Sequence, residues 1–522
     1  MELSENLDQS IRRKIMNKTK RLLAACLAAA SILSVTACTE EGGSPVQSGA
    51  PVVTTTTLAT DSTGANTTTD PDANAKTDQE IKEMDTSSYV PSGNAGTVKY
   101  LGYYDITVDQ KGEQQVNIFE SEKYGGKIEW ISASFGDGYF DKLATLIAAD
   151  DSPDLLTYEP QAFPFGVSKG LYEPLDEMLD MDDPLWADMK DLIKSYEYQG
   201  RHYYFPHRIV TWYALEYNRK TIADAGLEDP YDLYRKGEWT WDAWRQLMMD
   251  FCNISDDHIG YYATDATINA FVSTTGVVVV DYLPGGGAKN NLNHPDVTRA
   301  VEYLAEMGRS GLLYPESHPH GDWVSPQVFA ETSDKILFLG LEPEWSYIAA
   351  TENIQNKSGV ENDIFDTVSD FAFVPYPRDP NSDTYYQGSS CFGYMIPKGA
   401  KNSAGAIEFI MCNRLYETDE NIQAQIRKDH VDPEKITYVA GKYEGMQKWQ
   451  MKWDPEIYDL WREMCDPANF EFVIEDLYGF GTEMQGFIGQ SIINCTFGSE
   501  SWTQVSEEVA PLVQAKVDEL SA

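Results

Sequence analysis

Residues 200–218 constrain the possible folds of this chain more than any other stretch. Gly200 favours a tight turn, and the aromatic run at 203–205 favours a strand. Pro206 lacks a backbone N–H, so it predicts an interruption before a second β-rich run at 209–217. Two strands separated in this way can belong to different sheets. We therefore expect the chain to cross between two parts of the fold here.

The size and charge of the chain limit the number of lobes and the kinds of partner that we expect. A chain of 522 residues exceeds the roughly 250–300 residues at which a single hydrophobic core stops growing, so we expect two lobes. The formal net charge is −43, from 40 basic and 83 acidic residues. Such a surface repels phosphate backbones, and we expect no nucleic-acid partner. The acidity is typical of a surface that keeps a protein in solution, and we expect a monomer.

The N-terminal region has the composition of an export signal. A basic head precedes an apolar segment at 22–37, which is shorter than the about 20 residues that span a bilayer. Residues 35–38, Val-Thr-Ala-Cys, resemble a bacterial lipobox, which implies cleavage before Cys38 and diacylglycerol on its thiol. We therefore predict a lipoprotein signal peptide at 1–37, with Met16 as an alternative start. Ordinary secretion without lipid is the alternative.

The segment that follows Cys38 is expected to be a disordered tether. Residues 38–97 are rich in Thr, Ser, Gly, Asp and Ala and have almost no large apolar side chains. They cannot bury enough apolar surface to fold. A lipid at one end and a folded body at the other would hold the protein at the outer face of a membrane. We expect this membrane to be that of a Gram-positive cell.

Several motifs in the body of the chain fit one known family. A Y-x-G-x-x-Y-x-x-P pattern followed by L-x-Y-N occurs at Tyr198, Gly200, Tyr203, Pro206, Leu215, Tyr217 and Asn218. Residues 142–154 read K-L-A-T-L-I-A-A-D-D-S-P-D, residues 239–242 read W-T-W-D, and residues 393–402 read G-Y-M-I-P-K-G-A-K-N. Together they resemble the bacterial extracellular solute-binding proteins of ABC importers, the maltose-binding-protein-like sugar receptors. The resemblance covers residues 98–522.

The resemblance implies an α/β fold of the type II periplasmic-binding-protein kind. Each of two lobes would contain a mixed sheet flanked by helices, with the ligand cleft between the lobes. Both crossovers would pass between discontinuous lobes. The implied boundaries are 98–210 with 377–420 for lobe 1, and 213–376 with 421–522 for lobe 2.

A βαβ unit is predicted near the start of the folded body. Residues 127–132 and 154–158 have the pattern of strands, and residues 138–149 have the pattern of an amphipathic helix. Ligands of open α/β sheets bind beyond the carboxyl ends of the strands, so the loops after both strands are expected at the cleft. Their candidate binding residues are Phe135, Tyr158 and Glu159.

Further candidates follow from the chemistry of sugars. A sugar ring presents an apolar C–H face to an indole, and its hydroxyls need hydrogen-bond partners once water leaves. Trp345 with the neighbouring carboxylate Glu344 suits this task, although Glu342 and Pro343 depart from the family pattern. The crossovers supply the other candidates, which are Trp212, Tyr213 and Tyr386.

Other conspicuous residues are expected to be scaffold. Helical spacing places on one core-facing stripe Trp241, Trp244, Leu247, Met248 and Phe251. Thr240 is a predicted N-cap, and Pro295 is a predicted helix start. The acidic cluster at 150–154 lacks a calcium-loop pattern and predicts a turn at a helix end. The five cysteines beyond the tether form no C-x-x-C pair and are expected to be buried thiols.

No enzyme motif accompanies these features. The chain lacks G-x-S-x-G, G-x-x-x-x-G-K-[ST] and H-E-x-x-H, and His318-Pro-His320 is expected to be an exposed loop. We expect no catalytic residue, metal or cofactor. The sequence predicts a lipid-anchored receptor that captures a carbohydrate, of oligosaccharide size, for an ABC permease. The alternatives are a surface glycoside hydrolase with two acting carboxylates, a carbohydrate adhesin, and a receptor for a non-sugar solute such as a peptide.

Overall fold

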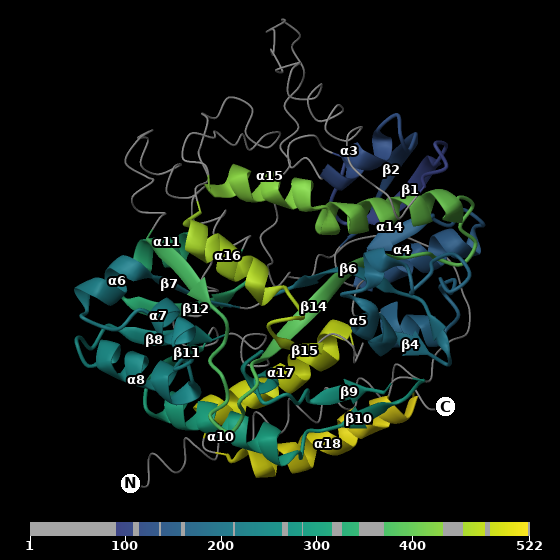
Figure 1. The fold of residues 1–522 in the computed structure, drawn as a ribbon. Coiled ribbons are helices and arrows are strands. Elements are labelled where there is room, and N and C mark those ends of the chain that lie inside the picture. The colour runs from purple at the N-terminus through teal and green to yellow at the C-terminus, as the bar shows by residue number, and fades with distance from the viewer. Residues whose placement is uncertain are drawn as a thin grey trace, which may run out of the picture. The chain divides into compact units, whose positions relative to one another are not determined.

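A computed structural model describes twelve stretches of the chain, all within the compact unit Asp70–Ala522 (Figure 1). These stretches are residues 90–107, 114–134, 137–157, 162–211, 214–263, 270–283, 285–315, 326–343, 370–431, 453–474, 481–498 and 500–519. Two larger sheets and two hairpins are formed by these residues, and helices flank the larger sheets. No helix among these stretches has the length and apolar character needed to span a membrane.

The first of the larger sheets has six strands in the order β15-β14-β3-β1-β2, with β6 also paired to β14. Its strands are β1 (Gly96–Gly102), β2 (Gly126–Ser132), β3 (Leu155–Thr157), β6 (Phe205–Val210), β14 (Tyr386–Met395) and β15 (Glu471–Ile474). β1 lies between β2 and β3 and is parallel to both. β14 is antiparallel to β3 and β6 and parallel to β15.

Helices of three to sixteen residues flank this six-stranded sheet. They are α3 (Gln114–Glu120), α4 (Asp137–Ala148), η1 (Ala162–Gly166), η2 (Pro184–Trp186), α5 (Lys190–Ser195) and α14 (Ser403–Thr418). Phe119 of α3 and Phe409 of α14 meet edge to face, with ring centroids 5.3 Å apart, and both are fully buried. Leu143 of α4 is also fully buried in this core. A hairpin of β4 (Glu197–Tyr198) and β5 (Arg201–His202) turns through Gly200, whose φ of +76° confirms the predicted tight turn.

The predicted βαβ unit is confirmed as β2, α4 and β3, but its two strands are not neighbours. They flank β1, a strand that we did not predict from the sequence. β1 begins directly after a long apolar-poor segment, and its seven residues alternate too briefly to give a strong period-two signal. Burial against both neighbours stabilises it, since Val98, Tyr100 and Leu101 have no exposed surface.

The second larger sheet has five strands in the order β11-β8-β12-β7-β13. They are β7 (Ala214–Asn218), β8 (Ile259–Ala263), β11 (Leu313–Pro315), β12 (Ile336–Leu341) and β13 (Phe371–Val374). β8, β11 and β12 are parallel, and β7 runs antiparallel between β12 and β13. A hairpin of β9 (Val280–Tyr282) and β10 (Ala288–Asn290) stands apart from this sheet.

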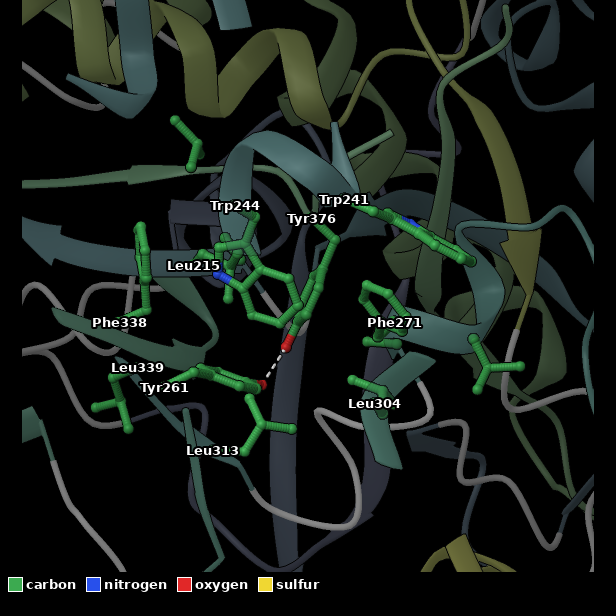
Figure 2. Close-up of a cluster of buried hydrophobic side chains, with 14 of the residues drawn as sticks. Leu215, Trp241, Trp244, Tyr261, Phe271, Leu304, Leu313, Phe338, Leu339 and Tyr376 are labelled. Carbon is green, nitrogen blue, oxygen red and sulfur yellow. Dashed lines mark hydrogen bonds between the residues drawn. The ribbon is translucent and has the colours of Figure 1, made fainter. Parts of the chain in front are cut away.

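Aromatic side chains fill the core beside the five-stranded sheet (Figure 2). Trp241 and Trp244 of α8 (Trp241–Cys252) are buried as predicted, and both pack against Phe271. Tyr261 and Tyr376 share a hydrogen bond of 2.8 Å within this cluster. The other helices of this region are α6 (Arg219–Asp224), α7 (Pro230–Arg235), α10 (Pro295–Arg309), α11 (Pro326–Thr332), α15 (Glu420–Val431), α16 (Pro455–Met464), α17 (Gly481–Phe497) and α18 (Trp502–Glu519).

The predicted helix starts are confirmed, and three of the five predicted buried thiols are confirmed. Thr240 caps α8 by accepting a hydrogen bond of 3.4 Å from the backbone N–H of Ala243, and Pro295 is the first residue of α10. Free thiols are present at Cys252, Cys391, Cys412, Cys465 and Cys495. Cys252 and Cys465 are only partly buried, whereas we expected buried thiols throughout.

The crossover at 200–218 occurs at a different residue from the one predicted. Pro206 lies inside β6, opposite Gly393 at a register shift in β14, rather than between two strands. A proline is accommodated at such an irregularity because the ladder already omits a hydrogen bond there. β6 continues to Val210, and the chain enters the five-stranded sheet at Ala214. The predicted change of sheet is confirmed, but it falls at 211–213.

Candidate functional site

One edge of the six-stranded sheet collects the ends of several strands. The parallel strands β1, β2 and β3 end there at Gly102, Ser132 and Thr157. β6 starts at this level, because Tyr394 pairs with both Thr157 and Phe205, and it continues beyond the other strands to Val210, which pairs with Ser390. β14 runs in the opposite direction, so it begins beyond this edge at Tyr386 and reaches the edge at Tyr394. We call this the carboxyl edge of the six-stranded sheet, and ligands of open α/β sheets bind beyond such edges.

Side chains hold the carboxyl edge in place. The buried Tyr139 hydroxyl lies 3.0 Å from the carbonyl oxygen of Leu101 and 3.3 Å from that of Thr157, so it joins the ends of β1 and β3. The Trp130 indole N–H donates to the carbonyl of Gly102 over 2.9 Å and joins β2 to β1. Because these donors bond to backbone, the positions at which the loops leave the sheet are rigid.

The five-stranded sheet has a matching edge. β12 ends at Leu341, which pairs with Ala214, the first residue of β7. β13 ends at Val374, which pairs with Leu215. β8 and β11 run parallel to β12 and end on the same side. The chain therefore enters and leaves this sheet at one edge, the edge that adjoins both crossovers.

Three passes of the chain meet at hydrogen bonds between the two sheets. The Gln387 side-chain amide donates to the Thr211 hydroxyl and to the carbonyl of Met464, each over 2.9 Å. The Thr211 hydroxyl also lies 3.3 Å from the Met464 carbonyl oxygen and 3.7 Å from the Cys465 sulfur. Burial raises the pKa of the Cys465 thiol, which therefore stays neutral beside Thr211 at physiological pH. We call Thr211, Gln387, Met464 and Cys465 the junction.

The two segments that lead into β14 and β15 are held to the core beside the five-stranded sheet, through Tyr385 and Phe470. The Tyr385 hydroxyl donates to the carbonyl of Trp239 over 3.0 Å, and burial raises the pKa of Tyr385 to about 12, so this donor keeps its proton. Phe470 stacks on Tyr234, whose hydroxyl donates to Glu463 over 2.8 Å.

Both passes enter the six-stranded sheet directly after these contacts. The backbone N–H of Glu471 donates to the carbonyl of Tyr385 over 3.0 Å. Pairing of Tyr386 with Glu471 starts directly beyond, where both strands join the six-stranded sheet.

Tyr386 is the predicted site residue that the structure describes. It is half-buried at the start of β14, and the hydroxyl end of its ring lies against Gly276. The remaining predicted residues lie outside the described stretches, namely Phe135, Tyr158, Glu159, Trp212, Tyr213, Glu344, Trp345 and the lipidation candidate Cys38. Residues 38–89 of the predicted tether and the histidines at 318 and 320 also lie outside them. The last part of the predicted tether, 90–97, is described: Ala95 is buried and β1 begins at Gly96.

The described residues beside these candidates belong to the two edges. Thr157 ends β3 directly before Tyr158, and Ser134 follows β2 directly before Phe135. Thr211 and Ala214 bracket Trp212 and Tyr213. Leu341 ends β12 three residues before Glu344.

Two residues at the carboxyl edge were not predicted from the sequence. Tyr103 and Tyr104 directly follow β1, and Tyr104 is 41% exposed. The aromatic pair was visible in the sequence, but its place in the fold was not, because β1 itself was missed. The acidic cluster proved structural, as predicted. Asp154 accepts three backbone N–H groups, and no group of side chains in the described stretches could hold a metal ion.

Solved structures share this fold at low sequence identity. The sugar-binding protein MalE from Xanthomonas citri is 14% identical, with a TM-score of 0.56 over 81% of this chain and 98% of its own. An ABC substrate-binding protein from Listeria monocytogenes in complex with cycloalternan is 14% identical, with a TM-score of 0.54 over 81% of this chain and all of its own, 100%. UgpB from Mycobacterium tuberculosis in complex with glycerophosphocholine is 13% identical, with a TM-score of 0.54 over 82% of this chain and 100% of its own.

These similarities show the mixed α/β fold of MalE-like, type II binding proteins. A comparison with curated protein sequences found no match. A family model gives a direct sequence match, since residues 114–432 fit the bacterial extracellular solute-binding protein family. That family consists of binding proteins rather than enzymes, and its members act outside the cytoplasm. The chain belongs to the family of bacterial extracellular solute-binding proteins.

Proposed function

We propose that this protein captures a carbohydrate of oligosaccharide size outside the cell and delivers it to the transmembrane subunits of an ABC permease. One observation carries this proposal. Phe135, Tyr158 and Glu159 follow the ends of β2 and β3 in the sequence. Trp212, Tyr213, Glu344 and Trp345 adjoin the edge of the five-stranded sheet in the sequence, and Tyr386 adjoins the junction residue Gln387. These candidates span residues 135–386, about 250 positions, and their places beside strand ends support one common site.

The chemistry of the candidate residues fits a sugar. Trp212, Tyr213, Trp345 and Tyr386 offer aromatic rings to the apolar faces of pyranoses, and Glu159 and Glu344 offer acceptors to hydroxyl groups. Sites that bind small molecules combine apolar walls with a few polar groups in this way. Two of the structures with this fold contain or are named for sugars, which supports the same class of solute.

The receptor would close around its solute by a hinge. The proposed lobes are 98–210 with 377–420, and 213–376 with 421–522. The junction supports a hinge at this place, since three passes of the chain run there between the core beside the five-stranded sheet and the strands of the six-stranded sheet. β15 would then be a strand that lobe 2 contributes to the sheet of lobe 1.

The lipid anchor is the second part of the proposal. Cys38 follows a basic head, an apolar run and Val35-Thr36-Ala37, so we propose that diacylglycerol on Cys38 holds the protein on the outer face of a Gram-positive membrane. Cys38→Ala tests this in the host cell. We expect the variant to appear in the medium or as an unprocessed precursor, whereas unchanged mature mass and detergent partitioning would refute the anchor.

A thermal-shift screen tests the choice of solute, because a tight solute stabilises the native state by mass action. The panel consists of maltotriose, cellotriose, xylotriose and mannotriose, with trialanine and glycerophosphocholine as non-sugar members. We expect a neutral trisaccharide to raise the melting temperature and to be recovered unchanged. The complex of UgpB with glycerophosphocholine makes a non-sugar solute the second candidate, and a shift with that compound alone would favour it.

A further inference from the structure

Tyr103 and Tyr104 occupy the middle of the carboxyl edge. β1 pairs with β2 from Gly96 to Gly102 on one side, and with β3 at Tyr100 and Leu101 on the other. The loops that begin beyond β2 and β3 carry Phe135 and Tyr158. The residues that follow β1 therefore leave the sheet between the starting points of two loops already proposed to contact the solute.

A series of rings connects this pair to the core. Tyr139 is 1% exposed, and its hydroxyl bonds to the backbone at the ends of β1 and β3. Tyr103 packs edge to face on Tyr139, with ring centroids 6.3 Å apart. Tyr104 packs edge to face on Tyr103 at 5.1 Å and is 41% exposed. The rings lead from a fully buried tyrosine to one that presents much of its surface to solvent.

The backbone around the pair is fixed on both sides. Before it, the carbonyl of Gly102 accepts the Trp130 indole N–H and the Ala133 backbone N–H, each over 2.9 Å. After it, the Asp105 carboxylate accepts the Thr107 backbone N–H over 2.9 Å and the Thr107 hydroxyl over 2.6 Å. A ring held in this way loses little conformational freedom when a solute packs on it.

We propose that Tyr104 is a further carbohydrate-binding residue and that Tyr103 positions it. The inference rests on the proposed function and adds an aromatic surface between the loops after β2 and β3. The face of the Tyr104 ring packs on the C–H groups of a pyranose, and its hydroxyl exchanges hydrogen bonds with the sugar. Tyr103 acts through its edge-to-face contact and does not touch the sugar.

Titration calorimetry on the full chain without its signal peptide tests the proposal, with the panel trisaccharide that shifts the wild type most. Tyr104→Ala should weaken binding by roughly 5- to 140-fold, as expected for loss of one aromatic stacking surface. Tyr104→Leu should weaken binding similarly, because leucine supplies apolar bulk but no flat ring on which the sugar can stack. Tyr104→Phe should keep most of the affinity, and the melting temperatures of all three apo variants should stay near the wild-type value.

Two further variants separate positioning from general damage. Leu512→Ala removes another exposed apolar side chain, on α18, and should leave affinity unchanged. Tyr103→Ala should weaken binding in the wild-type background and have little further effect in the Tyr104→Ala background, because both changes remove the same contact.

The outcomes distinguish this inference from the proposed function. Wild-type affinity in a folded Tyr104→Ala variant, or a large loss of apo stability in that variant, overturns the inference and leaves the proposed function standing. Failure of the wild type to bind any trisaccharide overturns the proposed function and this inference with it.

Discussion

At the scale of single residues, Gly276 limits the position of Tyr386. Gly276 has a φ of +79°, a left-handed conformation that side chains disfavour. A Cβ on Gly276 would lie 2.9 Å from Tyr386 Cζ and 3.0 and 3.1 Å from its two Cε atoms. These distances are shorter than ordinary van der Waals contacts. Any side chain at 276 must therefore displace the ring at the start of β14.

Gly276→Ala should weaken carbohydrate binding through this displacement. The matched control is Gly237→Ala, because Gly237 has a φ of +74° and no atom within 4 Å of its Cβ position. Both variants bear the backbone strain of about 1–2 kcal/mol, but only the first moves Tyr386. Calorimetric affinities that fall equally, or not at all, in the two variants would remove Tyr386 from the site.

His207 makes stability depend on pH. Burial lowers its pKa well below the usual 6.5, and the cations of Arg208 and Arg414 lower it further. The unfolded chain therefore binds a proton below pH 6.5 that the folded protein does not, and stability falls as the pH falls through this window.

The free energy of unfolding should drop by up to about 1.4 kcal/mol per pH unit from pH 6.5 to pH 5 through His207. Urea titrations across this range measure the slope. His207→Phe retains an aromatic ring for the stacked contact with Tyr394 and should flatten the dependence. An unchanged slope in that variant would assign the effect to other groups.

At the scale of elements, one carboxylate joins two strands of the six-stranded sheet to the start of a helix that flanks it. Asp154, at the entry to β3, accepts the backbone N–H of Lys99 in β1 over 3.0 Å. It also accepts those of Lys401 and Asn402 before α14, over 2.8 and 2.7 Å. Asn402 then caps α14 by accepting the backbone N–H of Gly405 over 3.1 Å. The loss of Asp154 would leave three backbone donors without their acceptor.

Asp154→Ala should lower the free energy of unfolding by about 2–4 kcal/mol, because hydrogen bonds to a buried charged acceptor are costly to lose. Asp151→Ala is the control, since Asp151 is exposed and pairs with Lys99 on the surface. Urea denaturation of both variants checks the prediction. Equal stability of the two variants would show that solvent replaces Asp154 as acceptor.

Local patterns predicted the elements that carry a strong period or a distinct end signal. The helices at Trp241 and Pro295 and the βαβ unit are of this kind. β1 was missed, and the predicted position of Pro206 between two strands was wrong. Both depend on partners far away in the chain. Pro206 is tolerated through an irregularity in β14, some 190 residues later. The residues around Pro206 carry no pattern that indicates this irregularity in β14.

Part of the candidate site could be predicted in outline, because it depends on local patterns such as strand ends. Residues after strands could be named from the order of the elements, and Tyr386 could be named from the family motif. The junction could not, since Thr211, Gln387 and Met464 have no shared pattern and meet only in the folded chain. Tyr104 was missed along with β1.

At the scale of the whole molecule, the arrangement suits a receptor that opens and closes. Two hydrophobic cores serve the two larger sheets, and hydrogen bonds at the junction join the passes between them. The five-stranded-sheet core fixes the chain as far as Tyr385 and Phe470, and β14 and β15 start directly beyond. A bend at the junction would leave both cores intact.

Small-angle scattering should detect this bend. We expect the radius of gyration to decrease when a saturating panel trisaccharide is added, as in hinge closure of periplasmic binding proteins. The control is a sugar that produces no thermal shift, which should leave the curve unchanged. Identical dimensions with and without the bound trisaccharide would argue against closure.

The central claim is that residues at the strand ends of the two larger sheets together bind a carbohydrate. Calorimetric titration of the wild type and of Trp345→Ala with the same trisaccharide tests it most directly. The account predicts saturable binding to the wild type, and binding weaker by about 1–3 kcal/mol in a variant whose apo melting temperature changes little. Wild-type affinity in the folded variant, or no saturable heat with the wild type, would contradict it.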